Sequence, residues 1–249
     1  KGRIDYPIDD VKEFLSGADL TIISNESPFL ENCTQEAGTT SFCGKPAYMQ
    51  NLKDIGTDII SLTGNHMCDY GKAPFQNTID LYKDNSMSYF AGGVNLGEAW
   101  EPLYLDTSAG TIAFVGYNDM GPGGVLATEE LPGSAPFDDA RFQTAMAEAA
   151  EKADIVWVDT HLWPEYWSGA DDKRQRVHSD RAVDLGADIV TGVSSHDVHG
   201  YYFKDGVPIF LGLGNFLFDQ MWSEETREGL VLEVTLYDKR IRRIELHPT

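Results

Sequence analysis

Short apolar runs alternate with amphipathic segments along most of the chain. Continuous apolar runs predict buried strands at residues 20–24, 57–63, 155–160 and 189–193. Segments whose apolar residues recur at helical spacing separate these runs, and the clearest helix covers residues 138–153. Repeated strand–helix–strand units predict an α/β fold with mostly parallel strands and helices on both faces of the sheet.

The C-terminal part follows a different pattern. Two pairs of strands are predicted after residue 200, with turns at residues 204–206 and 238–239. Strands joined by such short turns run antiparallel, so we expect C-terminal antiparallel hairpins in a mixed, mostly parallel fold. No linker separates the segments, and a single domain over residues 1–249 is therefore predicted.

The charge of the chain restricts its partners. Its 249 residues include 40 Asp and Glu against 19 Lys and Arg, which gives a formal net charge of −21. Such a chain repels phosphate backbones, so nucleic-acid binding is not expected. An anionic substrate would need a local positive charge, from clustered arginines or a bound cation. No apolar run reaches the ~20 residues that span a bilayer, so no transmembrane segment is expected in this chain.

Two of the three cysteines bracket a turn-rich loop. A disulfide between Cys33 and Cys43 would remove about 2.5–3 kcal/mol of chain entropy from the unfolded state. Such a bond fits an oxidising compartment. The alternative is two unpaired thiols in a loop. Cys68 is left over and is expected to be a reduced thiol.

Polar side chains able to bind a metal follow four of the predicted strands. They are Glu26 after the first strand, Asn65, His66 and Asp69 after the second, His161 and Glu165 after the third, and His196 and His199 after the fourth. Ligands of parallel α/β sheets bind beyond the carboxyl ends of the strands, so we expect these side chains to gather around one point. Imidazole, carboxylate and amide groups without thiolate suit a divalent Zn, Mn or Fe ion.

His66 and Asp69 suggest acid–base chemistry. A carboxylate three residues after the histidine would hold the imidazole in one tautomer and let it protonate a leaving group. The alternative for Asp69 is the N-cap of the following helix. A serine nucleophile at Ser195 is not favoured, because adjacent residues on an extended segment point to opposite sides and Ser195 would not meet His196.

Five ordered segments are similar to one protein family. They resemble the bacterial capsule-synthesis CapA (PGA_cap) proteins, which in turn resemble calcineurin-like metallophosphoesterases; the segments are SNESP, TGNHMCDYG, VDTHLWPEY, VTGVSSHDVHG and LGLGNFLFD. The resemblance runs from residue 19 to about residue 245. It implies a four-layer αββα metallophosphatase-like sandwich, exported or anchored at the cell surface, with a role in poly-γ-glutamate capsule metabolism.

The resemblance also implies roles for single residues. The implied metal ligands are Glu26, Asn65, His161 and His196. His66 with Asp69 corresponds to the acid–base pair, and Glu165 to a further acidic residue of the catalytic set. Residues 214–216 match a late G-N-F signature.

The chain departs from the family pattern at several positions. The family's first strand, with its Gly-Asp, is expected upstream of Lys1, so that aspartate ligand is not in the sequence. Ser194 stands where a histidine is expected, and His199 is the candidate substitute ligand. Asn25 is displaced by one residue from the family's N-x-E motif, which on a strand turns it to the other face.

Three functions remain open from the sequence. The first is an exported, metal-dependent hydrolase of an anionic phosphoester or γ-glutamyl polymer. The second is a non-catalytic binding or assembly module with a degenerate metal site and partners in the cell envelope. The third is a carbohydrate-binding protein that uses Trp163 and Trp167.

Overall fold

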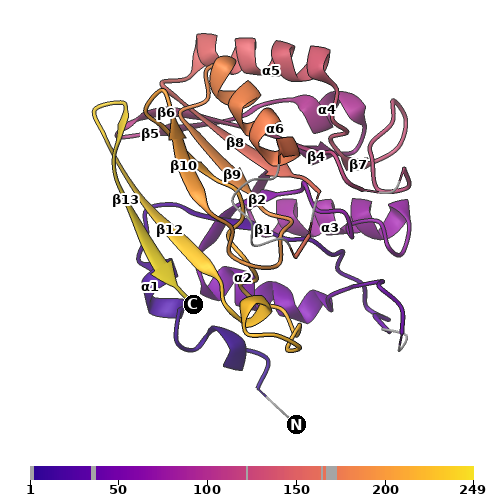
Figure 1. Cartoon of the computed structure of the whole chain (residues 1–249). Helices are drawn as coiled ribbons and strands as arrows, with labels where there is room; N and C mark the ends of the chain where they lie inside the picture. Colours follow the sequence, from indigo (N-terminus) through magenta and orange to yellow (C-terminus); the bar gives the residue numbers. More distant parts are fainter. Residues whose placement is uncertain (1–2, 35–37, 122, 164, 167–172) are drawn as a thin grey trace. The chain divides into compact units, whose positions relative to one another are not determined.

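The chain folds into two compact units. The computed structural model describes residues 3–34, 38–121, 123–163, 165–166 and 173–249 (Figure 1). The first unit consists of Lys1–Ala99 and Gly121–Ala135, and the second of Trp100–Met120 and Pro136–Thr249. The single domain that the sequence predicts stays a prediction.

A parallel three-stranded sheet forms the centre of the first unit. Its order is β1 (Thr21–Ser24), β2 (Thr57–Ser61), β3 (Ser88–Phe90). The helix α2 (Met49–Asp54) precedes β2, and α3 (Lys72–Asp84) connects β2 to β3. The shorter elements are η1 (Tyr6–Ile8), α1 (Lys12–Ser16), η2 (Pro46–Tyr48), β4 (Gly92–Gly93), α4 (Leu96–Trp100) and β7 (Gly133–Ser134).

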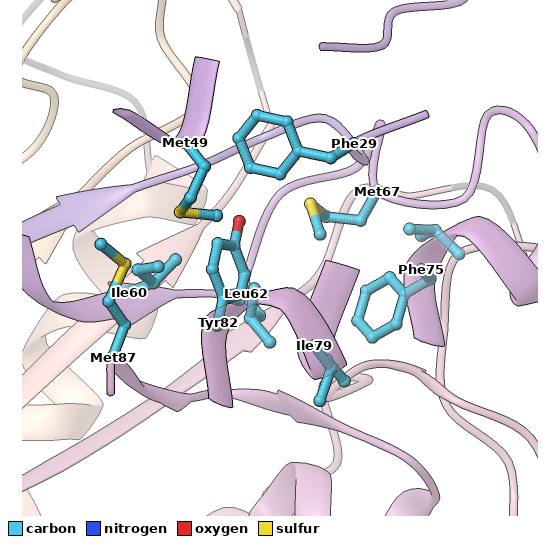
Figure 2. Close-up of a cluster of buried hydrophobic side chains, with 10 residues drawn as sticks. Phe29, Met49, Ile60, Leu62, Met67, Phe75, Ile79, Tyr82 and Met87 are labelled. Atoms are coloured by element: carbon cyan, nitrogen blue, oxygen red, sulfur yellow. The ribbon is translucent and has the colours of Figure 1, made fainter. Parts of the chain in front are cut away.

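The core of the first unit lies between β2 and α3. Figure 2 shows apolar side chains from these elements and from the loops around them gathered about Tyr82. They are Phe29, Met49, Ile60, Leu62, Met67, Phe75, Ile79, Met87 and Val125. Asn25 Nδ2 donates a hydrogen bond to Tyr82 Oη at 2.6 Å. The side chain of Asn25 therefore satisfies a buried hydroxyl of the core.

The start of α3 differs from the sequence prediction. The helix begins at Lys72, and Gly71 precedes it with φ of 91°, a left-handed value that glycine adopts without strain. The alternative role of Asp69 as N-cap is therefore wrong, because the residues before Gly71 form separate turns. Backbone hydrogen bonds from Asp69 N to His66 O and from Gly71 N to Cys68 O close these turns.

The second unit contains a mixed six-stranded sheet. Its order is β10 (Tyr201–Lys204), β11 (Val207–Phe210), β9 (Ile189–Gly192), β8 (Ile155–His161), β6 (Gly110–Asn118), β5 (Leu103–Thr107). The four central strands are parallel, and the two edge strands are antiparallel to their neighbours. The helix α5 (Asp139–Lys152) packs on β6 and β8, and α6 (Lys173–Asp184) packs on β9 (Figure 1).

Two antiparallel hairpins confirm the predicted C-terminal pattern. The first joins β10 to β11. The second joins β12 (Leu230–Tyr237) to β13 (Arg240–Pro248), drawn in yellow in Figure 1, and η3 (Glu225–Arg227) precedes it. Asp238 and Lys239 have φ of 50° and 62°, as expected for a two-residue turn that follows the twist of the strands. The α/β class with mostly parallel strands is confirmed as well.

The cysteines and the helices bear on the environment of the chain. The structure joins Cys33 and Cys43 in a disulfide, with a Cα–Cα distance of 5.7 Å. Cys68 is a half-buried free thiol, and burial raises its pKa. Among the described residues, every helix is too short or too polar to cross a bilayer.

Candidate functional site

The turn after β2 brings Gly64, the residue before Asn65, against Glu26. Gly64 lies under Glu26 so closely that an added Cβ would stand 2.8 Å from both Cα and Cγ of Glu26. Real Cβ atoms are not found at that distance, so only glycine permits this approach. Ser134 of β7 donates a hydrogen bond from its Oγ to Gly64 O at 3.1 Å, which fixes the turn. Glu26 is thereby held against the residue that precedes Asn65.

Asn65 has an amide oxygen suited to a ligand. The residue is 9% exposed, and within the described part of the chain its Oδ1 has no hydrogen-bond partner. A buried polar atom without a partner costs about 1–3 kcal/mol. Such atoms are rare, and in native structures they point to a ligand, ion or water. This amide oxygen and the carboxylate of Glu26, which packs on the preceding Gly64, have the donor chemistry that suits a divalent cation.

His66 is fixed by a carboxylate. Its Nδ1 donates to Asp69 Oδ2 at 2.7 Å. The backbone N–H of Phe42 donates to the same oxygen at 2.7 Å, and the Phe42 ring meets the imidazole edge-on at a centroid distance of 4.6 Å. The side chains of His66 and Asp69 are 17% and 14% exposed. Because Nδ1 is committed to Asp69, any proton exchange by this ring would have to use Nε2.

In the second unit, His161 is the last residue of β8 and is fully buried. It is paired in register with Asn118, the last residue of β6, and Asp119 N donates to His161 O at 3.0 Å. The strand ends therefore present an amide and an imidazole side by side. The apolar run alone predicts a strand that ends at residue 116, so Asn118 was missed; the polar pair Asn118 and Asp119 after that run was the available signal.

A neutral amide orients His196. Its Nδ1 lies 2.9 Å from Asn215 Oδ1. Asn215 Nδ2 donates to Thr226 O at 3.0 Å and to Gln220 Oε1 at 3.2 Å. A carbonyl can only accept, so the amide NH₂ must face Thr226 and the amide oxygen must face the ring. Nδ1 therefore carries the proton and Nε2 carries the lone pair, which is the form in which histidine binds a metal.

Two aromatic rings stack on His196. Tyr166 lies at a centroid distance of 5.1 Å with the planes 17° apart, and Phe218 at 5.7 Å and 27°. Gln220 Nε2 donates to Tyr166 Oη at 2.9 Å, so the stack and the amide network are linked. His196 has φ of 59°, a conformation that side chains rarely adopt. Its surroundings hold it there, as is typical of functional positions.

Ser194 closes a latch between two loops. Its Oγ donates to Leu162 O and accepts from Leu162 N at 3.1 Å. These bonds join the segment after β8 to the segment after β9. Ser194, which stands where the resemblance leads us to expect a histidine, therefore has a structural role.

His199 is held by two side chains. Its Nε2 lies 3.1 Å from Asp197 Oδ1, and its Nδ1 lies 3.3 Å from Gln175 Oε1. The side chain is fully buried. A metal would have to displace one of these bonds, so the geometry counts against His199 as a substitute ligand.

A further imidazole, His178 of α6, also lies beside a carboxylate. Its Nδ1 is 3.0 Å from Tyr117 Oη, and its Nε2 is 3.3 Å from Asp119 Oδ2. Arg174 binds the same carboxylate at 2.6 Å. Burial lowers the pKa of His178 and outweighs the opposite effect of Asp119. His178 is therefore a neutral, structural histidine.

Two sequence hypotheses lie at the edge of the described residues. Glu165 is half-buried, and Trp163 is 53% exposed. Trp167 lies outside the described residues. The catalytic role of Glu165 and the carbohydrate-binding function stay predictions.

The structure thus brings together smaller sets than the sequence predicts. Glu26 packs against Gly64, and His66 is hydrogen-bonded to Asp69. In the second unit His161 adjoins Asn118, and His196 adjoins Asn215. Among the described residues, no three His, Cys, Asp or Glu side chains form a group that could hold a metal ion. The complete ligand set around one point stays a prediction.

Two curated relatives cover most of this chain. The capsule biosynthesis protein CapA of Bacillus anthracis is 28% identical over 253 residues, which are 98% of this chain and 61% of the relative. The PGA biosynthesis protein CapA of Bacillus subtilis (strain 168) is 32% identical over 198 residues, which are 79% of this chain and 52% of the relative. The matches thus span between half and two thirds of these relatives.

Solved structures share the fold. A hypothetical protein from Thermus thermophilus matches with a TM-score of 0.60 at 16% identity, over 99% of this chain and 92% of that one. A novel phosphatase of Mycoplasma pneumoniae matches at 0.56 and 14%, over 99% and 87%. The NAD nucleotidase of Haemophilus influenzae matches at 0.59 and 11%, over 99% and 49%. At these identities the likeness shows a metallophosphatase-like fold and nothing finer.

The family follows from the sequence match. The family described as bacterial capsule synthesis protein PGA_cap matches residues 1–220, which include all the strand-end residues from Glu26 to His196. Together with the two CapA relatives and the phosphatase-like fold, this match shows that the chain belongs to the PGA_cap family of bacterial capsule synthesis proteins.

Proposed function

We propose that this chain is a metal-dependent hydrolase that cleaves an anionic phosphoester during capsule synthesis outside the cell. The observation that carries the proposal is the turn after β2. It holds an imidazole on a carboxylate, at 2.7 Å, directly after an asparagine whose buried amide oxygen has no partner among the described residues. A proton donor and a ligand atom thus occupy consecutive positions in the chain.

The cation would be held by oxygen and nitrogen atoms that the fold already orients. At the turn after β2 the candidate ligands are Glu26 and Asn65. In the second unit, taken by itself, the candidate ligands are His161 and His196. A divalent Mn, Zn or Fe ion would polarise the phosphoryl oxygens and lower the pKa of a bound water. It would also supply the positive charge that a chain of net charge −21 lacks for an anionic substrate.

His66 would act as the general acid. In the imidazolium form both ring nitrogens carry protons, and Nε2 gives its proton to the leaving-group oxygen. The ring is then neutral and keeps its Nδ1–H bond to Asp69, so it does not move during the transfer. Positioned proton transfer of this kind contributes about 10²–10⁴-fold to a rate.

The γ-glutamyl polymer is a further substrate class to test. One relative is named a capsule biosynthesis protein and the other a PGA biosynthesis protein, and both are named CapA. The disulfide between Cys33 and Cys43 supports an oxidising, extracellular environment. Anchoring at the cell surface is compatible with the same proposal.

A non-catalytic binding or assembly module is the second candidate. The Ser194 latch favours it, because a hydroxyl that bonds Leu162 on both sides replaces a metal-binding imidazole. Cell-envelope proteins would then be its partners.

One experiment separates the two candidates. The chain is stripped with a chelator, reloaded with Mn, Zn or Fe, and assayed with p-nitrophenyl phosphate, its bis-ester and poly-γ-glutamate. We expect metal-dependent phosphoester hydrolysis that falls by about 10²–10⁴-fold in His66→Asn. His247→Asn, which alters the exposed pair with Glu233 on the β12–β13 hairpin, is the matched control. Equal rates for wild type and His66→Asn would exclude the catalytic role, and failure to bind metal would favour the binding module.

A further inference from the structure

We propose that the Cys33–Cys43 disulfide clamps the catalytic imidazole and that Phe42 is the positioning residue through which it acts. This inference rests on the acid role of His66 in the proposed function. The clamp consists of Phe42, Cys43 and the disulfide to Cys33. The sequence pattern gives no sign that the loop from Cys33 to Cys43 contacts His66.

The first contact is a shared carboxylate oxygen. Phe42 N and His66 Nδ1 both donate to Asp69 Oδ2, each at 2.7 Å. Asp69 is thus held between two donors that come from different segments of the chain. An anchored carboxylate allows fewer orientations of the imidazole than one that turns freely, so Phe42 fixes His66 through Asp69.

The second contact is between the rings. The Phe42 and His66 rings meet at a centroid distance of 4.6 Å with their planes 77° apart, which is an edge-to-face arrangement. Aromatic pairs in this geometry contribute about 0.5–1.5 kcal/mol beyond their buried area. The ring therefore limits rotation of the imidazole about its side-chain bonds, while the backbone N–H fixes its partner.

The position of Phe42 depends on the residues that follow it. Phe42 belongs to no helix or strand, and Cys43 after it is covalently joined to Cys33. Gly44 comes next; it donates to Pro28 O at 2.9 Å and accepts from Leu30 N at 2.8 Å.

Gly44 also packs closely on the segment it pairs with. A Cβ at Gly44 would stand 3.0 Å from two Phe29 ring carbons, and Phe29 belongs to the buried core around Tyr82. The disulfide and this glycine thus tie the clamp to the core of the first unit.

Opening the disulfide should release the clamp. A dithiol reductant gives two electrons and two protons, so that Cys33 and Cys43 become thiols and the reductant becomes its own disulfide. Phe42 then keeps its peptide bond but loses the covalent restraint next to it. The Phe42 N–H bond to Asp69 and the ring contact with His66 weaken together.

The test follows the His66 Nδ1 proton by NMR in ¹⁵N-histidine-labelled full chain at one fixed pH. We expect a low-field, slowly exchanging proton in the oxidised wild type. It should be weakened in Phe42→Ala, which removes the ring but keeps the backbone N–H, and lost in the Cys33→Ser/Cys43→Ser variant and after dithiothreitol. Phe42→Tyr, which keeps the ring as well, should retain it. Dithiothreitol on the double cysteine variant controls for other effects of the reductant, and Phe203→Ala, an exposed aromatic of β10, controls for ring removal.

Kinetics with a phosphoester gives the second measurement. Loss of the clamp should lower kcat by about tenfold and leave KM within about twofold, because misplacement of a catalytic group affects the transition state more than binding. Phe42→Ala keeps the disulfide, so it remains informative if the cysteine variant does not fold. A His66 proton signal that is unchanged by reduction and by Phe42→Ala would overturn the clamp.

The two proposals fail in different ways. If no phosphoester is cleaved but the proton signal depends on Phe42 and the disulfide, the proposed function fails and the positioning stands. If hydrolysis needs His66 while reduction changes neither kcat nor the signal, the positioning fails and the proposed function stands.

Discussion

His66 in the first unit and His196 in the second are both oriented through Nδ1, but their partners differ. His66 donates to the carboxylate of Asp69 and is partly exposed. His196 donates to the amide oxygen of Asn215 and lies under two stacked aromatic rings. A carboxylate stabilises a ring that carries charge, whereas an amide selects a tautomer without favouring the charged form. The same side chain therefore has the partner expected of a proton donor in one unit and the partner expected of a metal ligand in the other, as the proposed function requires.

The largest expected effect comes from removing the charge beside His66. Asp69→Asn keeps an acceptor for Phe42 N–H and His66 Nδ1–H but no longer stabilises the imidazolium, so kcat for a phosphoester should fall by roughly 10²–10³-fold. Steady-state kinetics of the metal-loaded chain measures this. Glu233→Gln, which neutralises the partner of His247 on the hairpin, should leave kcat unchanged. A fall of less than threefold in Asp69→Asn would remove the basis of the comparison.

The next effect concerns the close approach of Glu26. Gly64→Ala forces a Cβ to within 2.8 Å of Glu26 backbone and side chain, which should cost roughly 1–3 kcal/mol in the free energy of unfolding and weaken metal binding. Urea unfolding and a metal titration measure the two quantities. Gly124→Ala has no atom within 4 Å of its new Cβ and is the control. Normal metal affinity in Gly64→Ala would show that Glu26 is not a ligand.

The amide partner of His196 can be changed in two ways. Asn215→Leu removes the acceptor and should weaken metal binding by about 10–100-fold, as loss of a partner behind a metal ligand usually does. Asn215→Asp gives His196 the type of partner that His66 has. ¹⁵N NMR of the ring reports the tautomer, and isothermal titration reports the affinity. If Asn215→Leu binds metal like wild type, His196 either is no ligand or needs no orientation by residue 215.

The smallest effect concerns His178, which lies beside a carboxylate and is nevertheless kept neutral by burial. Its folded-state pKa is lowered, so between the unfolded value of about 6.5 and the lower folded value the unfolded chain binds more protons. The free energy of unfolding should therefore fall as the pH drops from 7 toward 5. His178→Gln should flatten this dependence relative to wild type in urea unfolding at several pH values. Identical pH profiles would show that His178 does not contribute.

The elements and the local pair could be predicted because they depend on short stretches of sequence. The apolar runs indicated the strands, and the polar residues after them marked the strand ends. His66 and Asp69 are three residues apart in one turn, so their contact needs no knowledge of the rest of the fold. The hairpin turns followed from local sequence for the same reason.

Contacts between distant segments could not be predicted. Phe42 meets Asp69 across 27 residues from an irregular loop, and no periodicity indicates where such a loop packs. The sequence offered His199 as a substitute metal ligand. Only the structure showed that both of its ring nitrogens lie within hydrogen-bond distance of the buried side chains of Gln175 and Asp197. Gly71 has a left-handed φ and precedes α3, so the helix begins at Lys72 and Asp69 is not its N-cap.

The Ser194 latch has a consequence for protein engineering. A designer who wished to add the imidazole that the family resemblance implies would choose Ser194→His. That exchange removes the hydroxyl that accepts from Leu162 N–H and donates to Leu162 O. The same substitution would therefore add a ligand and break the hydrogen bonds that join the segments after β8 and β9. A useful redesign would first give Leu162 a new partner from another position and only then replace the serine.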